Sequence, residues 1–342
     1  MPRKQITISD VAARAGVSTT TVSRVINNKN EITPDTRARV LQTMAELGFR
    51  PSHVARGLAM ISSHTIGYVV SDMTNPFQGA IIQAIHHVAQ SHHYSVTARI
   101  SYNAAAEEVR AIEALVADGV DGVILTLGPS SEVDQIVDRY ADAGVLFVST
   151  SLRPCSSRVS QIAPGTEEAS CQLVRYLISL GHRRIAHIKA SPATRGGRTK
   201  LLGYTRAMSE AGLPIEPELV VAADYDVEDA ARAARQLLHL PKPPTAIFAT
   251  NDIVAMGTLM AAHQIGISVP DEISVAGFDD IMFARCTNPP LTTVRQPGSD
   301  IGEAAARMLL EMIEASKPSQ VTGLSLPLVV RQSTGPCKDT GM

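Results

Sequence analysis

Apolar positions near the start of the chain recur at intervals of three and four residues, in short runs separated by turn and capping residues. In one run Val22, Val25 and Ile26 fall at i, i+3 and i+4, which places them on one face of a helix. Gly16 supplies a turn before this helix, because glycine adopts positive φ without steric cost. An earlier run predicts a helix over residues 8–15, so the two together predict a helix-turn-helix.

A third helix is predicted after the second. Thr33 can cap it, Pro34 occupies its first position and Gly48 follows its end. Its inward stripe is expected to consist of Val40, Leu41, Met44 and Leu47. Three short helices around one small core are typical of a DNA-reading head whose second helix enters the major groove. The alternative is a helical hairpin that packs against another structure.

The outward face of the second predicted helix is polar and carries one charge, that of Arg24. An ordinary surface helix carries Glu and Lys pairs, whereas hydroxyls, a guanidinium and an amide suit base edges and phosphates. We therefore expect Arg24 to contact a guanine or a phosphate. The expected DNA-binding residues of the head, including Thr7 as the cap of the first helix, are Thr7, Ser18, Thr19, Thr20, Thr21, Ser23, Arg24 and Asn27.

Residues 51–63 are predicted to be a hinge and linker. Ser52 can cap a short helix in which Val54 and Leu58 share one side. The run is shorter than the ~12–15 residues that a free helix needs, and Gly57 weakens it further. We therefore expect the hinge to fold only on DNA, the alternative being a plain linker with a buried leucine.

From residue 65 onward, apolar β-branched runs alternate with helical stretches, and the strand starts are 24 to 34 residues apart within two sets of four. This spacing is typical of βα units in a parallel sheet with helices on both faces. The expected starts are Ile66, Tyr94, Gly122 and Leu146, then Arg184, Glu218, Thr245 and Ile273, with late strands in 291–296 and 324–331. The fold class expected is an all-α helix-turn-helix headpiece plus an α/β core of two doubly wound parallel-sheet lobes.

Charge is unevenly distributed along the 342 residues. Residues 1–60 hold nine Lys or Arg and four Asp or Glu, whereas the whole chain has a net charge of −2. A basic head on an acidic remainder suits one nucleic-acid-binding domain. No signal-peptide pattern and no apolar run of ~18 residues is present, so we expect a cytoplasmic, nucleoid-associated protein without membrane contact. The four cysteines have no pairing or metal spacing and are expected to be free thiols.

Residues 6–61 resemble the headpiece of the lactose/galactose repressor family, most clearly from Val17 to Ile26. The resemblance continues through Thr250-Asn251-Asp252 and Gly277-Phe278-Asp279-Asp280, and the core is similar to periplasmic sugar-binding proteins. It implies a repressor that binds a near-palindromic, double-stranded operator as a homodimer and responds to a small-molecule effector. It also implies that Leu58 enters the minor groove as an apolar wedge.

In that fold the chain crosses between the lobes three times, and we place the crossings near Ile162, Pro290 and Gly323. The domains expected are a headpiece at 1–50, a hinge and linker at 51–63, a first lobe at 64–161 plus 291–323, and a second lobe at 162–290 plus 324–342. The tail after Gln332 has no leucine heptads, which favours a dimer over a tetramer.

Ligands of open α/β sheets bind beyond the carboxyl ends of the strands, where carboxylates and amides bind hydroxyl groups. The resemblance places Asn251 and Asp279 at effector-hydroxyl positions, and it places Lys200 where most members have arginine. A lysine there is compatible with a sugar acid, with a neutral sugar as the alternative. The expected ligand-binding residues are Asp72, Asn75, Phe77, Thr126, Ser149, Lys200, Tyr225, Asn251 and Asp279.

The remaining constellations point to neither a cofactor nor catalysis. His86 and His93 would lie two helical turns, ~10 Å, apart, which is too far for one metal ion, and the adjacent His87 and His92 diverge from them. The chain has no phosphate-cradling glycine motif and no nucleophile elbow. We therefore expect no enzyme. The other classes considered are a solute-binding protein of a transport system and an enzyme on the same fold.

Overall fold

The computed structural model describes residues 8–26, 32–47, 62–126, 130–151, 159–190, 197–315 and 321–338. The chain divides between Ser63 and His64 into two compact units, a headpiece and a core, each described by itself below. The predictions for Thr7, Asn27 and Leu58, and the hinge helix with them, lie outside the described residues.

The headpiece contains α1 (Ile8–Ala15), α2 (Thr19–Ile26) and α3 (Pro34–Leu47). Its core is Val11, Ala12, Ala15, Val22, Val25 and Val40. Ser18 caps α2, because its Oγ accepts the Thr21 N–H at 3.0 Å. The prediction that Leu41 faces inward is wrong, since this side chain is 50% exposed. It follows Val40 by one residue, about 100° around the helix, and therefore leaves the face that packs on α1 and α2.

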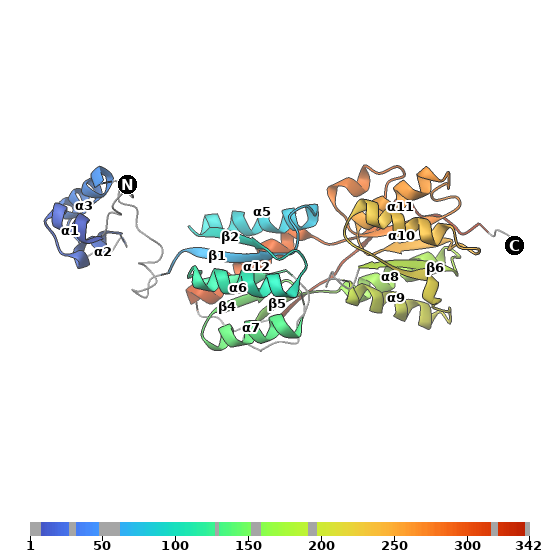
Figure 1. Ribbon diagram of the computed structural model, residues 1–342, viewed down its shortest axis with the longest axis horizontal. Coiled ribbons are helices and arrows are strands. Elements are labelled where there is room, and N and C mark those ends of the chain that lie inside the picture. The colour runs from blue at the N-terminus through green and yellow to red at the C-terminus, as the bar shows by residue number, and fades with distance from the viewer. Residues whose placement is uncertain are drawn as a thin grey trace. The chain divides into compact units, whose positions relative to one another are not determined.

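The first lobe of the core is a six-stranded sheet of order β11-β5-β4-β3-β1-β2, with every neighbouring pair parallel (Figure 1). Its strands are β1 (Thr65–Val70), β2 (Ser95–Ile100), β3 (Gly122–Leu125), β4 (Leu146–Ser149), β5 (Ser160–Pro164) and β11 (Val321–Leu324). Helices α5 (Pro76–Ser91) and α12 (Gly298–Ala315) form one apolar cluster with the sheet, and α6 (Ala105–Ala117) and α7 (Ser131–Asp142) form another.

The second lobe is a sheet of order β12-β10-β9-β8-β6-β7, parallel except for β12, which runs antiparallel to β10. Its strands are β6 (Ile185–Ala190), β7 (Val220–Ala223), β8 (Ala246–Ala249), β9 (Ser274–Asp279), β10 (Thr292–Arg295) and β12 (Leu328–Val329). Its helices are α8 (Thr166–Ser179), α9 (Arg198–Glu210), α10 (Val227–Leu238) and α11 (Asp252–Gln264), with 3-10 turns η1 (Pro217–Leu219) and η2 (Met282–Arg285).

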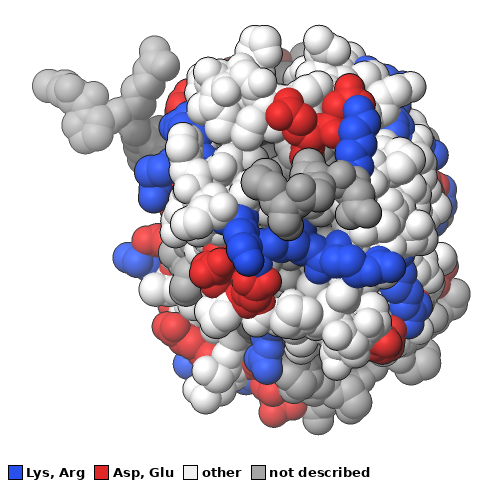
Figure 2. Space-filling model, turned by 90° about the vertical axis from the view of Figure 1, so that its right-hand side faces the viewer, with Lys and Arg blue, Asp and Glu red and all other residues white. Residues whose placement is uncertain are grey.

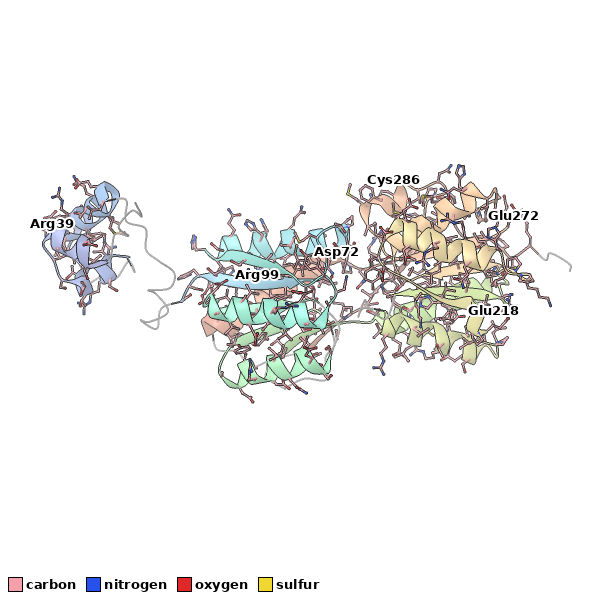
Figure 3. All side chains as sticks on the ribbon, viewed as in Figure 1. Arg39, Asp72, Arg99, Glu218, Glu272 and Cys286 are labelled. Atoms are coloured by element: carbon pink, nitrogen blue, oxygen red, sulfur yellow. The ribbon has the colours of Figure 1, made fainter. Side chains whose placement is uncertain are left out.

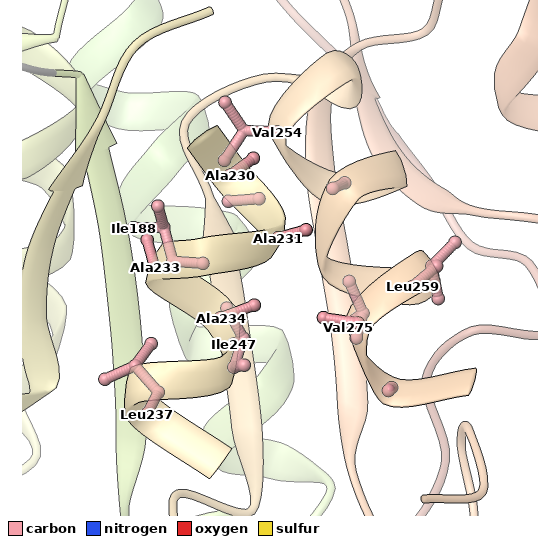
Figure 4. Packing of buried hydrophobic residues seen from close by; sticks show 14 of the residues in the cluster. Ile188, Ala230, Ala231, Ala233, Ala234, Leu237, Ile247, Val254, Leu259 and Val275 are labelled. Carbon is pink, nitrogen blue, oxygen red and sulfur yellow. The ribbon is translucent and has the colours of Figure 1, made fainter. Parts of the chain in front are cut away.

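Small side chains let α10 and α11 pack closely on one face of this second sheet. Figure 4 shows Ala230, Ala231 and Ala234 of α10 between α11 and the strands. At Gly257 of α11 a Cβ would collide with the Val227 carbonyl oxygen, so only glycine permits this approach. A closely packed layer of helices therefore covers this part of the sheet, which includes β8 and β9.

Two predicted crossings between the lobes need correction. Residues 292–295 were assigned to the first lobe, but β10 pairs with β9 in the second sheet, so the chain returns after Arg295 and not near Pro290. Likewise β5 pairs in the first sheet through Pro164, so the chain leaves this lobe later than Ile162. Strand β5 was not predicted, because its sequence Ser-Gln-Ile-Ala-Pro is not an apolar run.

His187, a buried histidine on β6, makes the core sensitive to acid. Its ring stacks between Tyr204 and Phe248, Nδ1 donates to the Phe248 carbonyl oxygen at 2.9 Å, and Nε2 has no partner among the described residues. Burial lowers its pKa from 6.5 to about 4. Between these pH values the unfolded chain binds the extra proton, so stability is complete above pH 6.5 and falls toward pH 4, by about 3 kcal/mol.

We expect His187→Phe to remove this acid sensitivity. Between pH 8 and pH 4, the free energy of unfolding of this variant should fall by about 3 kcal/mol less than that of the original chain. Urea unfolding of the core at a series of pH values measures the difference. His263→Phe, at an exposed position, is the control and should follow the original pH dependence. Identical pH profiles for the original chain and His187→Phe would contradict the assignment.

Candidate functional site

The second helix of the headpiece presents a polar face to the outside. Thr19, Thr20 and Arg24 are exposed, whereas Val22 and Val25 on the opposite face are buried. This is the orientation that a helix needs if it is to place side chains against base edges.

Two of the predicted DNA contacts also build the start of α2. Ser18 Oγ and Thr21 Oγ1 lie 2.9 Å apart, in addition to the cap bond from the Thr21 N–H. Thr21 and Ser23 are half-buried. The bonded pair of Ser18 and Thr21 therefore orients the first turn, from which Thr19 and Thr20 project.

In the core, Lys200 and Asp279 meet at the carboxyl ends of β8 and β9. Lys200 Nζ donates to the Thr250 carbonyl oxygen at 2.6 Å, lies 3.9 Å from Asp279 Oδ1, and lies 4.3 Å from the centre of the Phe278 ring. Both charged residues are 6% exposed. Burial lowers the pKa of Lys200, which Asp279 opposes, and burial raises the pKa of Asp279, which Lys200 opposes. The lysine charge is thus compensated inside the protein.

Asp279 has a strained backbone, with φ of 112°, and Asp280 follows at φ of 55°. Residues other than glycine adopt such angles at a cost of ~1–3 kcal/mol, and they concentrate at functional sites. Gln296 Nε2 donates to Asp279 Oδ1 at 2.7 Å. Asp279 therefore joins the end of β9 to the crossing after β10.

Asp280 has a different role from its neighbour. Its buried carboxylate accepts from Arg295 Nε at 2.7 Å and from Arg331 Nη2 at 2.6 Å. These pairs hold the pKa of Asp280 below its usual range, against the effect of burial. The residue anchors the end of β10 and the tail after β12.

Asn75 and Asn251 cap the two helices that begin at this site. Asn75 Oδ1 accepts the Phe77 N–H of α5 at 3.0 Å, and Asn251 Oδ1 accepts the Val254 N–H of α11 at 2.9 Å. Each oxygen is committed to a cap, so it is the amide nitrogens that remain to donate. The sequence pattern therefore located both residues, but it did not show that their side-chain oxygens cap helices and only their nitrogens are left for a ligand.

Asp252 follows Asn251 at the same strand end, after β8, although it is not in the list of expected ligand-binding residues. Its carboxylate is fully buried and accepts from the Ile281 N–H at 2.8 Å and the Thr293 hydroxyl at 2.6 Å. Burial and the nearby Asp279 raise its pKa to about 8. Asp252 therefore fixes the bend that carries Asp279. Its position directly after Asn251 was the available signal.

Three other predicted residues make local hydrogen bonds, and a fourth, Tyr225, packs against the core. Thr126 Oγ1 donates to the Val69 carbonyl oxygen at 3.0 Å, and Ser149 Oγ donates to the Ser151 carbonyl oxygen at 2.8 Å. Asp72 accepts from the N–H and hydroxyl of Thr74. Tyr225 packs half-buried against the second-lobe core.

A cavity of about 580 Å³ lies beside Asp279, in the size range of small-molecule sites. The starts of α5 and α12, the ends of β9 and β10, and η2 line it. Of the predicted residues, Phe77 and Asp279 line it; its unpredicted polar residues include Arg285, Arg295, Gln296 and Asp300. In Figure 3, Asp72 and Cys286, the residue after η2, lie at the ends of the two lobes that face each other, and Glu218 and Glu272 lie toward the far end.

The far end of the core carries charges of both signs. Figure 2 shows a row of Lys and Arg across this face with Asp and Glu beside it. Arg184 pairs with Glu218 and Lys338 with Asp271, each at 2.7 Å. Within the described parts of the chain, no group of three or more His, Cys, Asp or Glu is placed to hold a metal ion, and none of the helices found there combines the length and apolarity of a membrane span.

The family models that match cover both units. Residues 7–52 match "Bacterial regulatory proteins, lacI family", and residues 174–334 match "Periplasmic binding protein-like domain". The chain is 32% identical to catabolite control protein A of Priestia megaterium over 96% of its own length and 99% of that protein. It is 33% identical to the transcriptional repressor PurR of Vibrio parahaemolyticus over 96% and 98%.

Solved structures of transcriptional regulators are also similar to this chain. The Lac repressor dimer bound to operator superimposes with a TM-score of 0.81 at 28% identity, covering 97% of this chain and 100% of that one. The complex of the regulator CelR with cellobiose gives 0.71 at 29%, covering 96% and 99%. A helix-turn-helix head on a periplasmic-binding-protein-like core defines a ligand-responsive transcriptional regulator. The chain belongs to the LacI family. It is a DNA-binding repressor regulated by an effector, and members of this family are not enzymes.

Proposed function

We propose that two copies of this protein bind a near-palindromic operator, each placing α2 in the major groove of one half-site. The observation that carries this proposal is the exposed polar face of α2, with Arg24 outward over the buried Val22 and Val25. A two-fold symmetric dimer with two reading helices requires a two-fold symmetric site. Relatives support it, since the Lac repressor is seen as a dimer on its operator.

The same proposal includes the residues outside the described ranges and the domain limits. Thr7 caps α1, Asn27 extends the polar face of α2, and Leu58 wedges into the minor groove from the hinge. The headpiece spans 1–50 and the linker 51–63, with the lobes of the core following.

The effector is proposed to be a small polyhydroxylated metabolite, a sugar acid or a sugar. Asp279, Gln296 and the amide nitrogens of Asn75 and Asn251 supply the acceptors and donors that hydroxyl groups need. The related regulator CelR was crystallised with cellobiose. Effector and operator binding are linked, with a coupling of ~1–3 kcal/mol.

We expect Arg24→Ala to lower affinity for DNA that the full-length protein selects from a random pool by ~5- to 150-fold. This corresponds to the ~1–3 kcal/mol of a bidentate arginine–guanine contact, and one position of each half-site should lose its preference. Titration by fluorescence anisotropy at fixed salt measures both effects.

Arg39→Ala is the charge-matched control. Arg39 is exposed on α3 (Figure 3), so its removal should weaken binding to all sequences alike, by a few-fold. Equal losses in the two variants, with no change in base preference, would refute the role of Arg24.

A further inference from the structure

Lys200 lies beside Asp279, and Arg285 and Arg295 line the cavity next to it; these cations differ in how far the protein neutralises them. Lys200 is 6% exposed and already bonded to the Thr250 carbonyl oxygen, with the carboxylate of Asp279 at 3.9 Å. An acid group of a ligand would have to compete with that internal carboxylate. Lys200 is therefore poorly placed to recognise an anion, although its sequence position favours that role.

Arg285 is the opposite case. It ends η2, is exposed, and lines the cavity beside Asp279. In the part of the chain that the structure describes, its side chain makes no hydrogen bond or ion pair. The cavity's other arginine, Arg295, is bonded to Asp280 at 2.7 Å. Arg285 thus keeps its planar fork of donors available, and this fork matches a carboxylate.

The rest of the lining fits a molecule with both hydroxyls and an acid. Helices α5 and α12 begin at the cavity with Phe77 and Gly298 among its lining residues, and helix starts carry partial positive charge. Asp279 and the exposed Asp300 supply carboxylate oxygens, which accept hydroxyl protons and would repel an acid placed beside them. The two kinds of group are therefore expected to bind different ends of one ligand.

We propose that this cavity binds a sugar acid, with the carboxylate on Arg285, hydroxyl groups on Asp279 and Asp300, and the carbon face against Phe77. Lys200 organises the strand ends and does not contact the acid. This inference rests on the proposed function, because it names the residue that reads the charge of the effector.

The test uses the full-length protein and matched pairs of compounds. The acids are D-gluconate, D-galactonate, D-glucuronate and D-galacturonate; each is compared with its parent aldose, and sodium acetate tests a bare carboxylate. We expect at least one acid to raise the melting temperature more than its parent. Arg285→Gln should lower the affinity for that acid by ~10-fold or more, and Arg285→Lys should restore part of the loss. The affinity of either variant for the parent aldose should change by less than ~2-fold.

Arg110→Gln, on the exposed face of α6, is the control and should bind the acid normally. The inference is overturned if no acid stabilises the protein, if acetate alone reproduces the effect, or if Arg285→Gln binds the acid as well as the original chain. Affinity for selected DNA without ligand should stay unchanged in Arg285→Gln. Operator release by a neutral sugar alone would overturn the assignment to Arg285 and leave the proposed function intact.

Discussion

Replacing Val22 by Asp is expected to abolish specific DNA binding while leaving the core folded. Val22 is fully buried among Val11, Val25 and Val40. An unpaired carboxylate there costs several kcal/mol, and a unit as small as the headpiece has only ~3–5 kcal/mol of stability to lose. Because specific binding exceeds non-specific binding by ~10³-fold or more, affinity for the selected operator should fall by at least ~10³-fold.

Two measurements separate this effect from general unfolding. Since the core is a separate compact unit from His64, its calorimetric transition should stay within ~2 °C of the original. Ala13→Asp places the same charge at an exposed position of α1 and should weaken binding only a few-fold, through charge. Full operator affinity in Val22→Asp would show that α2 is not the reading element.

The headpiece was predictable because its signals are local. Gly16, Ser18 and Pro34 act within one turn of the helix that each one bounds. Helix α1 ends directly before Gly16, α2 begins directly after Ser18, and α3 begins at Pro34. Leu41 was misplaced because it lies at the edge of the apolar stripe, where burial depends on the neighbouring helices and not on the period alone.

Sheet membership in the core was less predictable, because strand pairing is not local. The segment containing Thr292 and Thr293 reads as a strand, but nothing in its own pattern says which lobe receives it. The structure shows that Thr293 bonds the buried Asp252 of the second lobe, a contact 41 residues away in the chain. The hydrophobic pattern of the sequence does not reveal this polar contact, which β10 makes as a strand of the second sheet.

The candidate effector site was predictable in position but not in chemistry. The strand-end rule located Asn251 and Asp279, and it would have located Gln296, which directly follows β10. It did not show that Lys200 is neutralised internally, because that depends on the Thr250 carbonyl group and on burial. Arg285 lies in a short 3-10 turn outside any strand end and carried no signal.

Replacing Asp279 by Gly is expected to remove the effector response at only a small cost to the stability of the core. Glycine adopts φ of 112° without the cost that aspartate bears, which offsets part of the loss. The buried Lys200 loses the carboxylate at 3.9 Å but keeps its bond to the Thr250 carbonyl oxygen, so the core should lose less than about 2 kcal/mol. Loss of charged hydrogen bonds to hydroxyl groups should lower the affinity for the effector by ~100-fold or more. The measurement is operator release by the compound that stabilises the original chain.

Asp280→Gly is the matched control, because Asp280 also has positive φ and also lies at the end of β9. Its carboxylate is bonded to Arg295 and Arg331, so its removal leaves two guanidinium groups without their partner. We expect its core to lose about 2 kcal/mol or more, a larger loss than that of Asp279→Gly, because two guanidinium groups lose their partner at once. If both variants were destabilised alike and Asp279→Gly still responded to the effector, the strain at Asp279 would serve the fold and not the ligand.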